Sequence, residues 1–311
     1  METLINNQIL EILACPRCKS GLTNFICSKC NLEFPIVNGV PILINEANSV
    51  FKFEDFTAKK ETTYKNSTDF RKFVKLLIPS VNLNVNSKER FDMFFSRLKD
   101  EKPKILIVGG AFEGEGFDVK NIRQDVYVLE TDVAFGKRTN LICDGHDLPF
   151  KNNTFDGVII QAVLEHVLEP IRCVSEIHRV LKNNGIVYSE TPFMQQVHAG
   201  KFDFTRFTHL GHRRLFRQFA EIESGAACGT GMALAWSYCY FLQSFFTSKL
   251  LGQIAFAFGS LTSFWLKYFD YLLIKKPAVY DAASGYYFLG QKSAEVLSDE
   301  ELLKSYKGTI Y

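Results

Sequence analysis

Four cysteines near the start of the chain have the residue type and the spacing of metal ligands. They form two Cys-x-x-Cys pairs separated by eight residues, namely Cys15, Cys18, Cys27 and Cys30. Two such pairs can complete a closed tetrahedral shell of thiolates around zinc, which leaves no position open for a substrate. We therefore expect a structural zinc ion here, and the alternative is a redox pair or two disulfides.

Polar side chains follow three successive apolar segments further along the chain. Glu130 and Asp132 follow the first segment, Asp144 the second and Gln161 the third. In an open α/β sheet, ligands bind in the crevice outside the carboxyl ends of the strands. The joint placement therefore predicts a ligand site at one sheet edge, whereas each carboxylate taken alone would better fit a solvated loop.

Glycines follow the buried strand that we predict over residues 104–108. Gly109 and Gly110 end this strand, and Gly114 lies four residues further on. Because glycine lacks a Cβ atom, it lets the backbone approach a ligand closely. A glycine-rich loop is by itself a weak signal of a cofactor site.

A polar and aromatic segment follows the strand that we predict over residues 186–190, a place that suits a substrate. Its His198 is our candidate general base, because an imidazole titrates near neutral pH and can accept a hydroxyl proton. A structural histidine bonded to a loop carbonyl is an equal alternative. Three arginines on a predicted helix would bind phosphate or carboxylate, or would form a solvated basic face: Arg213, Arg214 and Arg217.

The elements that carry these residues form a strand–helix–strand unit. An apolar run at 157–160 predicts a strand buried on both faces, and Pro170 opens a helix with a single apolar stripe. A further strand follows at 186–190. Such a unit is a right-handed crossover, which predicts an α/β protein.

Three motifs in this unit resemble those of class I S-adenosylmethionine-dependent methyltransferases of type 11. They are Asp-Gly-His-Asp-Leu-Pro-Phe from Asp144, Phe-Asp-Gly-Val-Ile-Ile-Gln-Ala-Val-Leu-Glu-His-Val from Phe155, and Glu-Ile-His-Arg-Val-Leu-Lys from Glu176. The resemblance covers roughly residues 103–220 and, more weakly, the last strand near Tyr286. It implies a Rossmann-like fold with a seven-stranded sheet, and S-adenosylmethionine as the methyl donor.

The resemblance also implies roles for the residues at the strand ends. One of Glu130 and Asp132 would bind the ribose hydroxyls of the cofactor, and the sequence does not decide between them. Asp144 would meet the adenine amino group, Gln161 would line the methionine side, and the glycines would lie against the cofactor. The chain departs from the family at Ile107, where an acidic residue is usual.

Residues 1–48 resemble the small zinc-ribbon protein that, as a separate subunit, binds and stabilises tRNA, rRNA and release-factor methyltransferases. A domain of about 45 residues cannot build enough core alone, so metal binding would supply much of its folding free energy. The resemblance implies a ribbon fused in cis to its catalytic partner. We expect a helical connector over residues 49–102, with apolar stripes at 70–77 and 91–98, and then the methyltransferase domain over residues 103–311.

An aromatic-rich insert over residues 225–280 precedes the last predicted strand. Residues 224–248 and 250–266 carry no charge, and the second run falls just short of the ~20 residues that span a bilayer. We expect helices that contact a membrane surface through residues 225–275 or that form a hydrophobic lid. The alternatives are a homodimer interface and an extension of the core.

Composition narrows the class of protein. The 311 residues are 47% hydrophobic and 23% charged with a formal charge of +2, so a globular protein without a strong nucleic-acid signal is expected. The N-terminus has no secretory signal pattern, and the remaining cysteines are scattered as in a reduced protein: Cys143, Cys173, Cys228 and Cys239. We expect a cytoplasmic protein that is either free or peripheral to the inner face of the membrane.

The function that these features favour is methyl transfer from S-adenosylmethionine to an unidentified acceptor. The aromatic insert favours a small-molecule, glycan or lipid-linked acceptor. The zinc ribbon favours the alternative of an RNA or protein methyltransferase with an activating ribbon in cis. A third interpretation is a non-catalytic module that binds partners, because the glycine segment departs from the family pattern.

Overall fold

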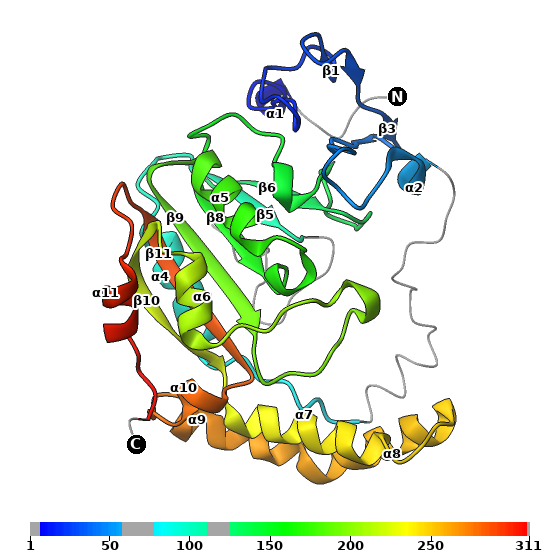
Figure 1. Ribbon diagram of the computed structural model, residues 1–311, viewed down its shortest axis with the longest axis vertical. Coiled ribbons are helices and arrows are strands. Elements are labelled where there is room, and N and C mark those ends of the chain that lie inside the picture. The colour runs from blue at the N-terminus through cyan, green and yellow to red at the C-terminus, as the bar shows by residue number, and fades with distance from the viewer. Residues whose placement is uncertain (1–6, 58–77, 111–124, 310–311) are drawn as a thin grey trace.

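A seven-stranded sheet forms the centre of the computed structural model, which describes residues 7–57, 78–110 and 125–309 (Figure 1). The strand order is β10-β11-β9-β8-β5-β6-β7. In chain order the strands are β5 (Lys104–Val108), β6 (Tyr127–Asp132), β7 (Leu141–Ile142), β8 (Phe155–Gln161), β9 (Leu181–Pro192), β10 (Phe219–Cys228) and β11 (Gly285–Lys292). Strands β5 to β9 pair in parallel, and β11 is antiparallel to β9 and β10. The predicted seven-stranded Rossmann-like fold is confirmed.

The central strands are apolar because both faces of the sheet are covered. Along β5, Leu106 and Val108 point into the core on one face, while Ile105 and Ile107 point into the core on the other. The first face is covered by α5 (Pro170–Val180) and the second by α4 (Ser87–Ser96). Side chains that alternate between two buried faces give the unbroken apolar runs seen in the sequence.

The N-terminal ribbon consists of α1 (Asn7–Leu10) and four two-residue strands. These are β1 (Ile26–Cys27), β2 (Leu32–Glu33), β3 (Ile36–Val37) and β4 (Val40–Pro41), paired as β1–β2 and β3–β4. Asn38 and Gly39 join the second pair with φ values of 52° and 81°, the backbone that a two-residue hairpin turn requires.

The ribbon packs on the edge of the large sheet. Ile42 forms a parallel bridge to Ile142 of β7, and the Leu43 amide donates to the Ile142 carbonyl at 2.8 Å. Leu13 bridges Phe150 in the antiparallel sense. Buried ribbon residues belong to the same core cluster as the strands β5 and β8. The ribbon and the sheet therefore share one hydrophobic core.

The segment between the ribbon and β5 is described only in part. The helix predicted over 70–77 lies outside the described residues, and the one predicted over 91–98 corresponds to α4. A short helix, α2 (Phe53–Thr57), follows the ribbon. Phe51 stacks on Phe202 with ring centroids 5.9 Å apart, so this segment also contacts the loop after β9.

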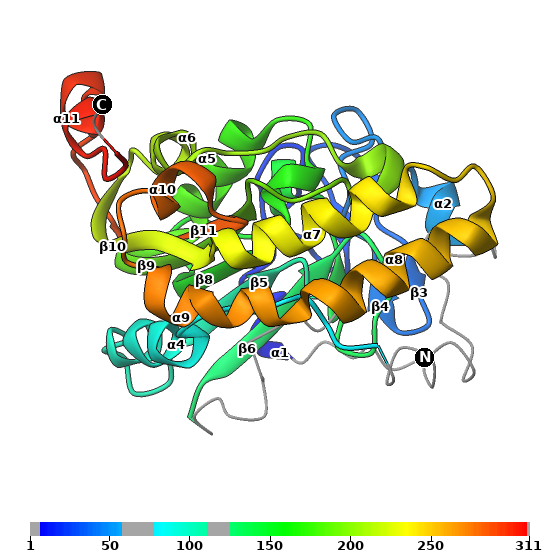
Figure 2. The same cartoon turned by 90° about the horizontal axis from the view of Figure 1, so that it is seen from below.

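The insert occupies residues 229–284, between β10 and β11, and is helical throughout most of its length. It comprises α7 (Thr230–Gln243), α8 (Lys249–Ser263), η5 (Phe264–Phe269), α9 (Asp270–Leu273) and α10 (Val279–Ala282). Helices α7 and α8 pack side by side as an antiparallel hairpin, at the opposite end of the molecule from the ribbon (Figures 1 and 2). The remaining helices outside the insert are η2 (Gly145–Asp147), η3 (Leu164–His166), η4 (Gly200–Phe202), α6 (His209–Leu215) and α11 (Asp299–Lys304).

Candidate functional site

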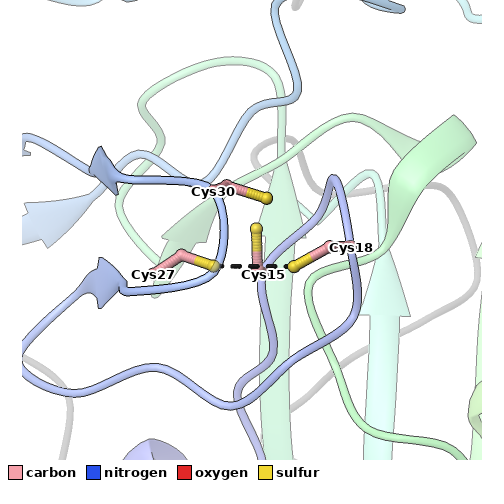
Figure 3. A group of neighbouring side chains, drawn as sticks. All are labelled: Cys15, Cys18, Cys27 and Cys30. Atoms are coloured by element: carbon pink, nitrogen blue, oxygen red, sulfur yellow. Dashed lines mark hydrogen bonds between the residues drawn. The ribbon is translucent and has the colours of Figure 1, made fainter.

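The four N-terminal cysteines converge on one point (Figure 3). Their sulfur atoms all lie within 4.8 Å of one another, and Sγ of Cys18 and Sγ of Cys27 are 3.5 Å apart. Each pair lies in a turn whose next residue is left-handed, Lys19 at φ 61° and Asn31 at φ 51°. Zinc–thiolate bonds of about 2.3 Å in a tetrahedron fit sulfur atoms at such separations. The donor set therefore fits a structural zinc ion.

The glycines at the end of β5 lie against the end of β6. Gly109 has φ +84°, a left-handed conformation, and the amides of Gly109 and Gly110 donate to the Thr131 carbonyl at 2.8 and 3.0 Å. A Cβ atom on Gly110 would lie 2.6 Å from Oε2 of Glu130, so a larger residue would clash there. Gly114 lies outside the described residues.

The structure distinguishes the two carboxylates at the end of β6. The Glu130 side chain is buried beside Gly110, and its Oε2 accepts from Nε of Arg138 at 3.0 Å. The Asp132 carboxylate instead accepts from the amide of Ala134 at 3.0 Å and caps the turn after the strand. Of the two, Glu130 therefore lies closer to the glycines that the cofactor would approach.

Asp144 begins the 3₁₀ helix η2. Its Oδ1 accepts from the backbone amide of His146 at 3.0 Å and from the ring Nδ1 of His146 at 2.6 Å. Its Oδ2 accepts from the hydroxyl of Ser49 at 2.5 Å. Burial opposes ionisation, but the hydrogen bonds from His146 and Ser49 outweigh it and lower the pKa of Asp144. The carboxylate is thus held as an anion by a residue that directly follows the ribbon.

Gln161 ends β8 and donates through Nε2 to Oε2 of Glu190 at 2.7 Å. Glu190, near the end of β9, also accepts from Asn84 and from the hydroxyl of Tyr188, and lies 3.6 Å from the guanidinium of Arg90. This buried network fixes the Gln161 amide at the sheet edge. Glu190 was missed as a site residue, although its place at a strand end is the signal that identified Glu130.

His198 lies in the loop after β9, and its ring faces that of a second histidine, His166. Its Nε2 is 3.0 Å from Nε2 of His166, and its Nδ1 is 3.5 Å from Oδ2 of Asp203. Burial opposes ionisation of Asp203, but hydrogen bonds from Arg206 and from the His198 amide lower its pKa to about 2. Asp203 is therefore a carboxylate at any physiological pH and orients the His198 ring.

Glu165 completes this group of side chains. It is fully buried, and neither of its carboxylate oxygens has a hydrogen-bond partner among the described residues. Burial raises the pKa of Glu165 to about 8 and lowers the pKa of His166. Neither residue was predicted as a site residue, although an adjacent Glu–His pair directly after a buried strand is a visible signal.

A cavity of about 600 Å³ lies beside the loop that carries His198. We call it the acceptor cavity. Its walls are residues 193–197 and 203–206 on one side, and Ser237 and Tyr240 of α7 on the other. Two hydrogen bonds join these walls: Gln196 Nε2 to the Ser237 hydroxyl at 3.2 Å, and the Tyr240 hydroxyl to the Val197 carbonyl at 3.3 Å. The insert therefore forms part of a cavity next to His198.

Comparison with known proteins finds two families in this chain. Residues 7–39 match the family described as Trm112p-like protein, and residues 115–189 match the family described as methyltransferase domain. The chain therefore joins a segment that matches a Trm112p-like family to a segment that matches a methyltransferase domain. Both predicted resemblances are confirmed.

Curated relatives match parts of this chain. A UPF0434 protein of Nitrosococcus oceani is 37% identical over 57 residues, which are 16% of this chain and 97% of that protein. Through its N-terminal segment the chain therefore belongs to the UPF0434 family. An uncharacterized protein of Methanocaldococcus jannaschii is 27% identical over 124 residues, 38% of this chain. The chain spans about half, 52%, of the length of that relative.

Solved structures of methyltransferases are similar to this chain only at a low level. One is a complex of the Haloferax volcanii Trm112 methyltransferase activator, at 15% identity and TM-score 0.41, covering 68% of this chain and 95% of that chain. Another is the Haemonchus contortus phosphoethanolamine N-methyltransferase 2 with S-adenosylmethionine, at 16% identity and TM-score 0.42, covering 78% and 60%. Similarity this low says nothing of the acceptor or the partners of the present protein.

Among the described residues, no helix has the length and apolar character that crossing a bilayer requires. The hairpin of α7 and α8 is nevertheless apolar on its outer side. Its exposed side chains include Phe241, Phe245, Leu250, Ile254 and Phe258, which are between 55% and 68% exposed. We call these five residues the hairpin face.

Proposed function

We propose that the protein transfers a methyl group from S-adenosylmethionine to a hydroxyl group of a lipid-linked small molecule or glycan that binds in the acceptor cavity. The observation that carries this proposal is the wall that α7 contributes to the cavity beside His198. The same helix is part of the apolar hairpin. An acceptor with a polar head and a lipid chain would use both features.

Binding of the cofactor is proposed for the residues at the carboxyl edge of the sheet. Glu130 would accept the ribose hydroxyls, Asp144 the adenine amino group, and Gln161 would line the methionine side. Two observations support this assignment. Glu130 lies so close to Gly110 that a Cβ atom there would clash with it, and a hydrogen bond to Glu190 fixes the side-chain amide of Gln161. Gly109, Gly114 and Asp132 remain proposed contacts of the same crevice.

The cofactor supplies a methyl group on a positively charged sulfur, which is already an activated leaving group. The acceptor oxygen forms the new bond to carbon as the carbon–sulfur bond breaks and its electron pair goes to sulfur, while the hydroxyl proton leaves to a base. His198 is the proposed base, because Asp203 faces its Nδ1 and leaves Nε2 as the proton acceptor. Positioning of the two reactants supplies most of the remaining rate acceleration.

Contact with an anionic membrane surface is the second part of the proposal. Residues 224–269 include no Asp or Glu, whereas Lys249, Lys275 and Lys276 are exposed in or next to the hairpin. Apolar side chains with neighbouring cations suit the headgroup region of an anionic bilayer. The membrane would then hold the lipid chain of the acceptor while the cavity holds its polar end.

Vesicle flotation tests the membrane part. The parent protein should float with vesicles that contain phosphatidylglycerol, and a variant with Phe241→Ser, Phe245→Ser and Ile254→Ser should not. The matched control carries Ile171→Ser and Leu303→Ser, which replace apolar residues that are equally exposed on α5 and α11. Failure of the parent to float, together with a stable dimer that the hairpin variant abolishes, would make the hairpin a subunit interface instead.

A methyl-acceptor screen tests the chemical part. Labelled S-adenosylmethionine is incubated with the protein and with lipid, glycan and RNA extracts, and we expect label in the lipid-extractable fraction. The variant His198→Gln should lower the rate at least tenfold without changing the affinity for the cofactor, because general-base catalysis contributes about 10²–10⁴-fold. Label that enters RNA alone would replace this proposal by the RNA methyltransferase alternative.

A further inference from the structure

Glu165, His166 and His198 form a cluster that proton transfer alone does not explain. Glu165 and His166 belong to η3, directly after β8, and His198 lies in the loop after β9. One ligand atom from each of the three residues lies within 4.8 Å of the other two. We call this group the Glu–His–His cluster.

The distances within the cluster fit a metal ion. The two Nε2 atoms are 3.0 Å apart, and Oε1 of Glu165 is 3.6 Å from Nε2 of His166 and 3.7 Å from Nε2 of His198. These three distances form a triangle with sides of 3.0, 3.6 and 3.7 Å. Within its plane, the point at equal distance from the three atoms lies about 2.0 Å from each of them. Bonds from zinc to imidazole nitrogen or carboxylate oxygen are about 2.0–2.2 Å long.

The hydrogen bonds of both rings leave the inner nitrogen atoms as acceptors. Nδ1 of His166 donates to the Phe202 carbonyl at 2.8 Å. Nδ1 of His198 faces two acceptors, the Gln196 carbonyl at 3.4 Å and Oδ2 of Asp203 at 3.5 Å. A neutral imidazole with its proton on Nδ1 presents a lone pair at Nε2. Metal-binding histidines commonly donate their other N–H to a carbonyl or carboxylate in this way.

The buried carboxyl group of Glu165 would supply negative charge to such an ion, because metal binding displaces the proton of a ligand. Its oxygens have no hydrogen-bond partner among the described residues, although the side chain is fully buried. A buried anion is unfavourable unless a cation or donors compensate it. The guanidinium of Arg206, whose charge acts on Glu165, is hydrogen-bonded to Asp203 instead, through Nη2 and Oδ2 at 2.8 Å.

We propose that Glu165, His166 and His198 bind one divalent first-row metal ion beside the acceptor cavity. Two imidazoles and one carboxylate leave coordination positions open, and such donors suit manganese, iron, cobalt or zinc. Gln196 and Val197, which precede His198 in the chain, line the acceptor cavity, so the ion would lie beside that cavity. Binding of the ion stands on the cluster alone, whereas its role in methyl transfer rests on the function proposed above.

The bound ion would activate the acceptor hydroxyl. The hydroxyl oxygen would occupy an open position, and the positive charge would lower its pKa so that its O–H bond breaks and the proton leaves to solvent. The oxygen then forms its bond to the methyl carbon while the carbon–sulfur electron pair stays with sulfur. In the metal-loaded protein His198 is a ligand, and in the metal-free protein its Nε2 is available as the base.

Metal titration tests the proposal directly. Full-length protein that carries zinc in its ribbon is titrated with Mn²⁺, followed by electron paramagnetic resonance, and with Co²⁺, followed by absorption. We expect one equivalent of each ion to bind, without the thiolate charge-transfer band that Co²⁺ on cysteines would give. The variants Glu165→Gln and His198→Gln should each weaken binding at least tenfold. His178→Gln serves as the matched control, because His178 lies on α5 and contacts the Ser293 carbonyl.

Zinc content and affinity for S-adenosylmethionine are measured for each variant, so that a folding defect is recognised. If neither ion binds at millimolar concentration, or if the cluster variants bind like the parent, the Glu–His–His cluster holds only protons and the proposal is wrong. Methyl transfer that proceeds unchanged in such a protein would overturn the metal site and leave the proposed function intact. Metal binding by a protein that methylates no acceptor would leave the metal site intact and overturn the proposed function.

Discussion

Glu130 lies where the ends of β5 and β6 meet, which is where the cofactor is proposed to bind. Its side chain is buried between Gly110 and Arg138. We expect Glu130→Ala to weaken S-adenosylmethionine binding by about 1.5–3 kcal/mol, the range for a hydrogen bond to a charged group. Calorimetric titration measures this as a loss of roughly 10- to 150-fold in affinity. Arg138→Ala is the matched control, since it breaks the same ion pair but keeps the carboxylate.

Asp132→Ala discriminates between the two carboxylates of this strand end. The Asp132 carboxylate caps the turn at Ala134. Loss of this carboxylate should therefore lower the stability of the fold slightly and change the affinity for the cofactor little. If Asp132→Ala loses the affinity and Glu130→Ala keeps it, the assignment is reversed.

Cys27, like Cys15, is a fully buried ligand that packs in the shared core, so its loss should affect the ribbon strongly. Cys27→Ser should remove the single zinc equivalent and unfold the ribbon, since metal binding supplies much of the folding free energy of such a module. Plasma emission spectrometry gives the zinc content, and limited proteolysis reports the fold. The control is Cys239→Ser, which replaces a buried cysteine of α7 and should retain one zinc ion. A Cys27→Ser variant whose ribbon stays folded without zinc would contradict the assignment.

Spacing along the chain explains which site residues could be predicted. The four cysteines lie in two local pairs, so their types and separations identify the site without any tertiary information. The Glu–His–His cluster lacks such a pattern, because the chain turns back over 32 residues before His198 meets His166. The path of that loop depends on contacts such as the ion pair of Arg206 with Asp203, which no periodicity reports.

Helices and strands with a clear apolar pattern were predicted, whereas their ends were not. The strand that follows α5 was predicted over residues 186–190. In the structure α5 ends at Val180, β9 begins at Leu181, and Asn184 takes the left-handed conformation with φ 64°. Leu181 has an extended backbone, with φ −70° and ψ 138°, and its side chain is fully buried, so the strand begins directly after the helix.

The segment after the ribbon and the 3₁₀ helix η2 are coupled elements. The hydroxyl of Ser49 donates to Asp144, and the side-chain amides of Asn45 and Asn48 donate through Nδ2 to Asp147 at 2.9 and 3.2 Å. Ser49→Ala should therefore loosen η2 and weaken cofactor binding by about 1 kcal/mol, the typical net value of one hydrogen bond. Calorimetry on this variant and on Thr23→Ala, which replaces an exposed residue of the ribbon, measures the effect.

A loss of affinity in Ser49→Ala without any change in zinc content would place the coupling in this contact. An unchanged affinity would mean that Asp144 is held well enough by His146 alone, through its backbone amide and its ring.

At the scale of the whole molecule, the docking of the ribbon could not be predicted from the sequence. The ribbon was expected as a separate domain, and its cysteine pattern gives its own fold. The bridge between Ile42 and Ile142 joins residues 100 positions apart, and both are ordinary buried isoleucines. Nothing in their types distinguishes them from other core residues, so only the folded chain identifies this contact.

The stability of the whole fold should fall in mild acid because two histidines are buried as neutral rings on α6. Burial lowers the pKa of His209 to about 4 and that of His212 to about 3, while an unfolded histidine titrates near 6.5. Between those values the unfolded chain binds protons that the folded chain does not, so stability is complete above pH 6.5 and is lost as the pH falls. At pH 5.5 each histidine should cost about 1.4 kcal/mol. Thermal melts at pH 7.5 and 5.5 should therefore differ less in His212→Phe than in the parent. An equal difference in the two proteins would mean that His212 already carries a proton in the folded state.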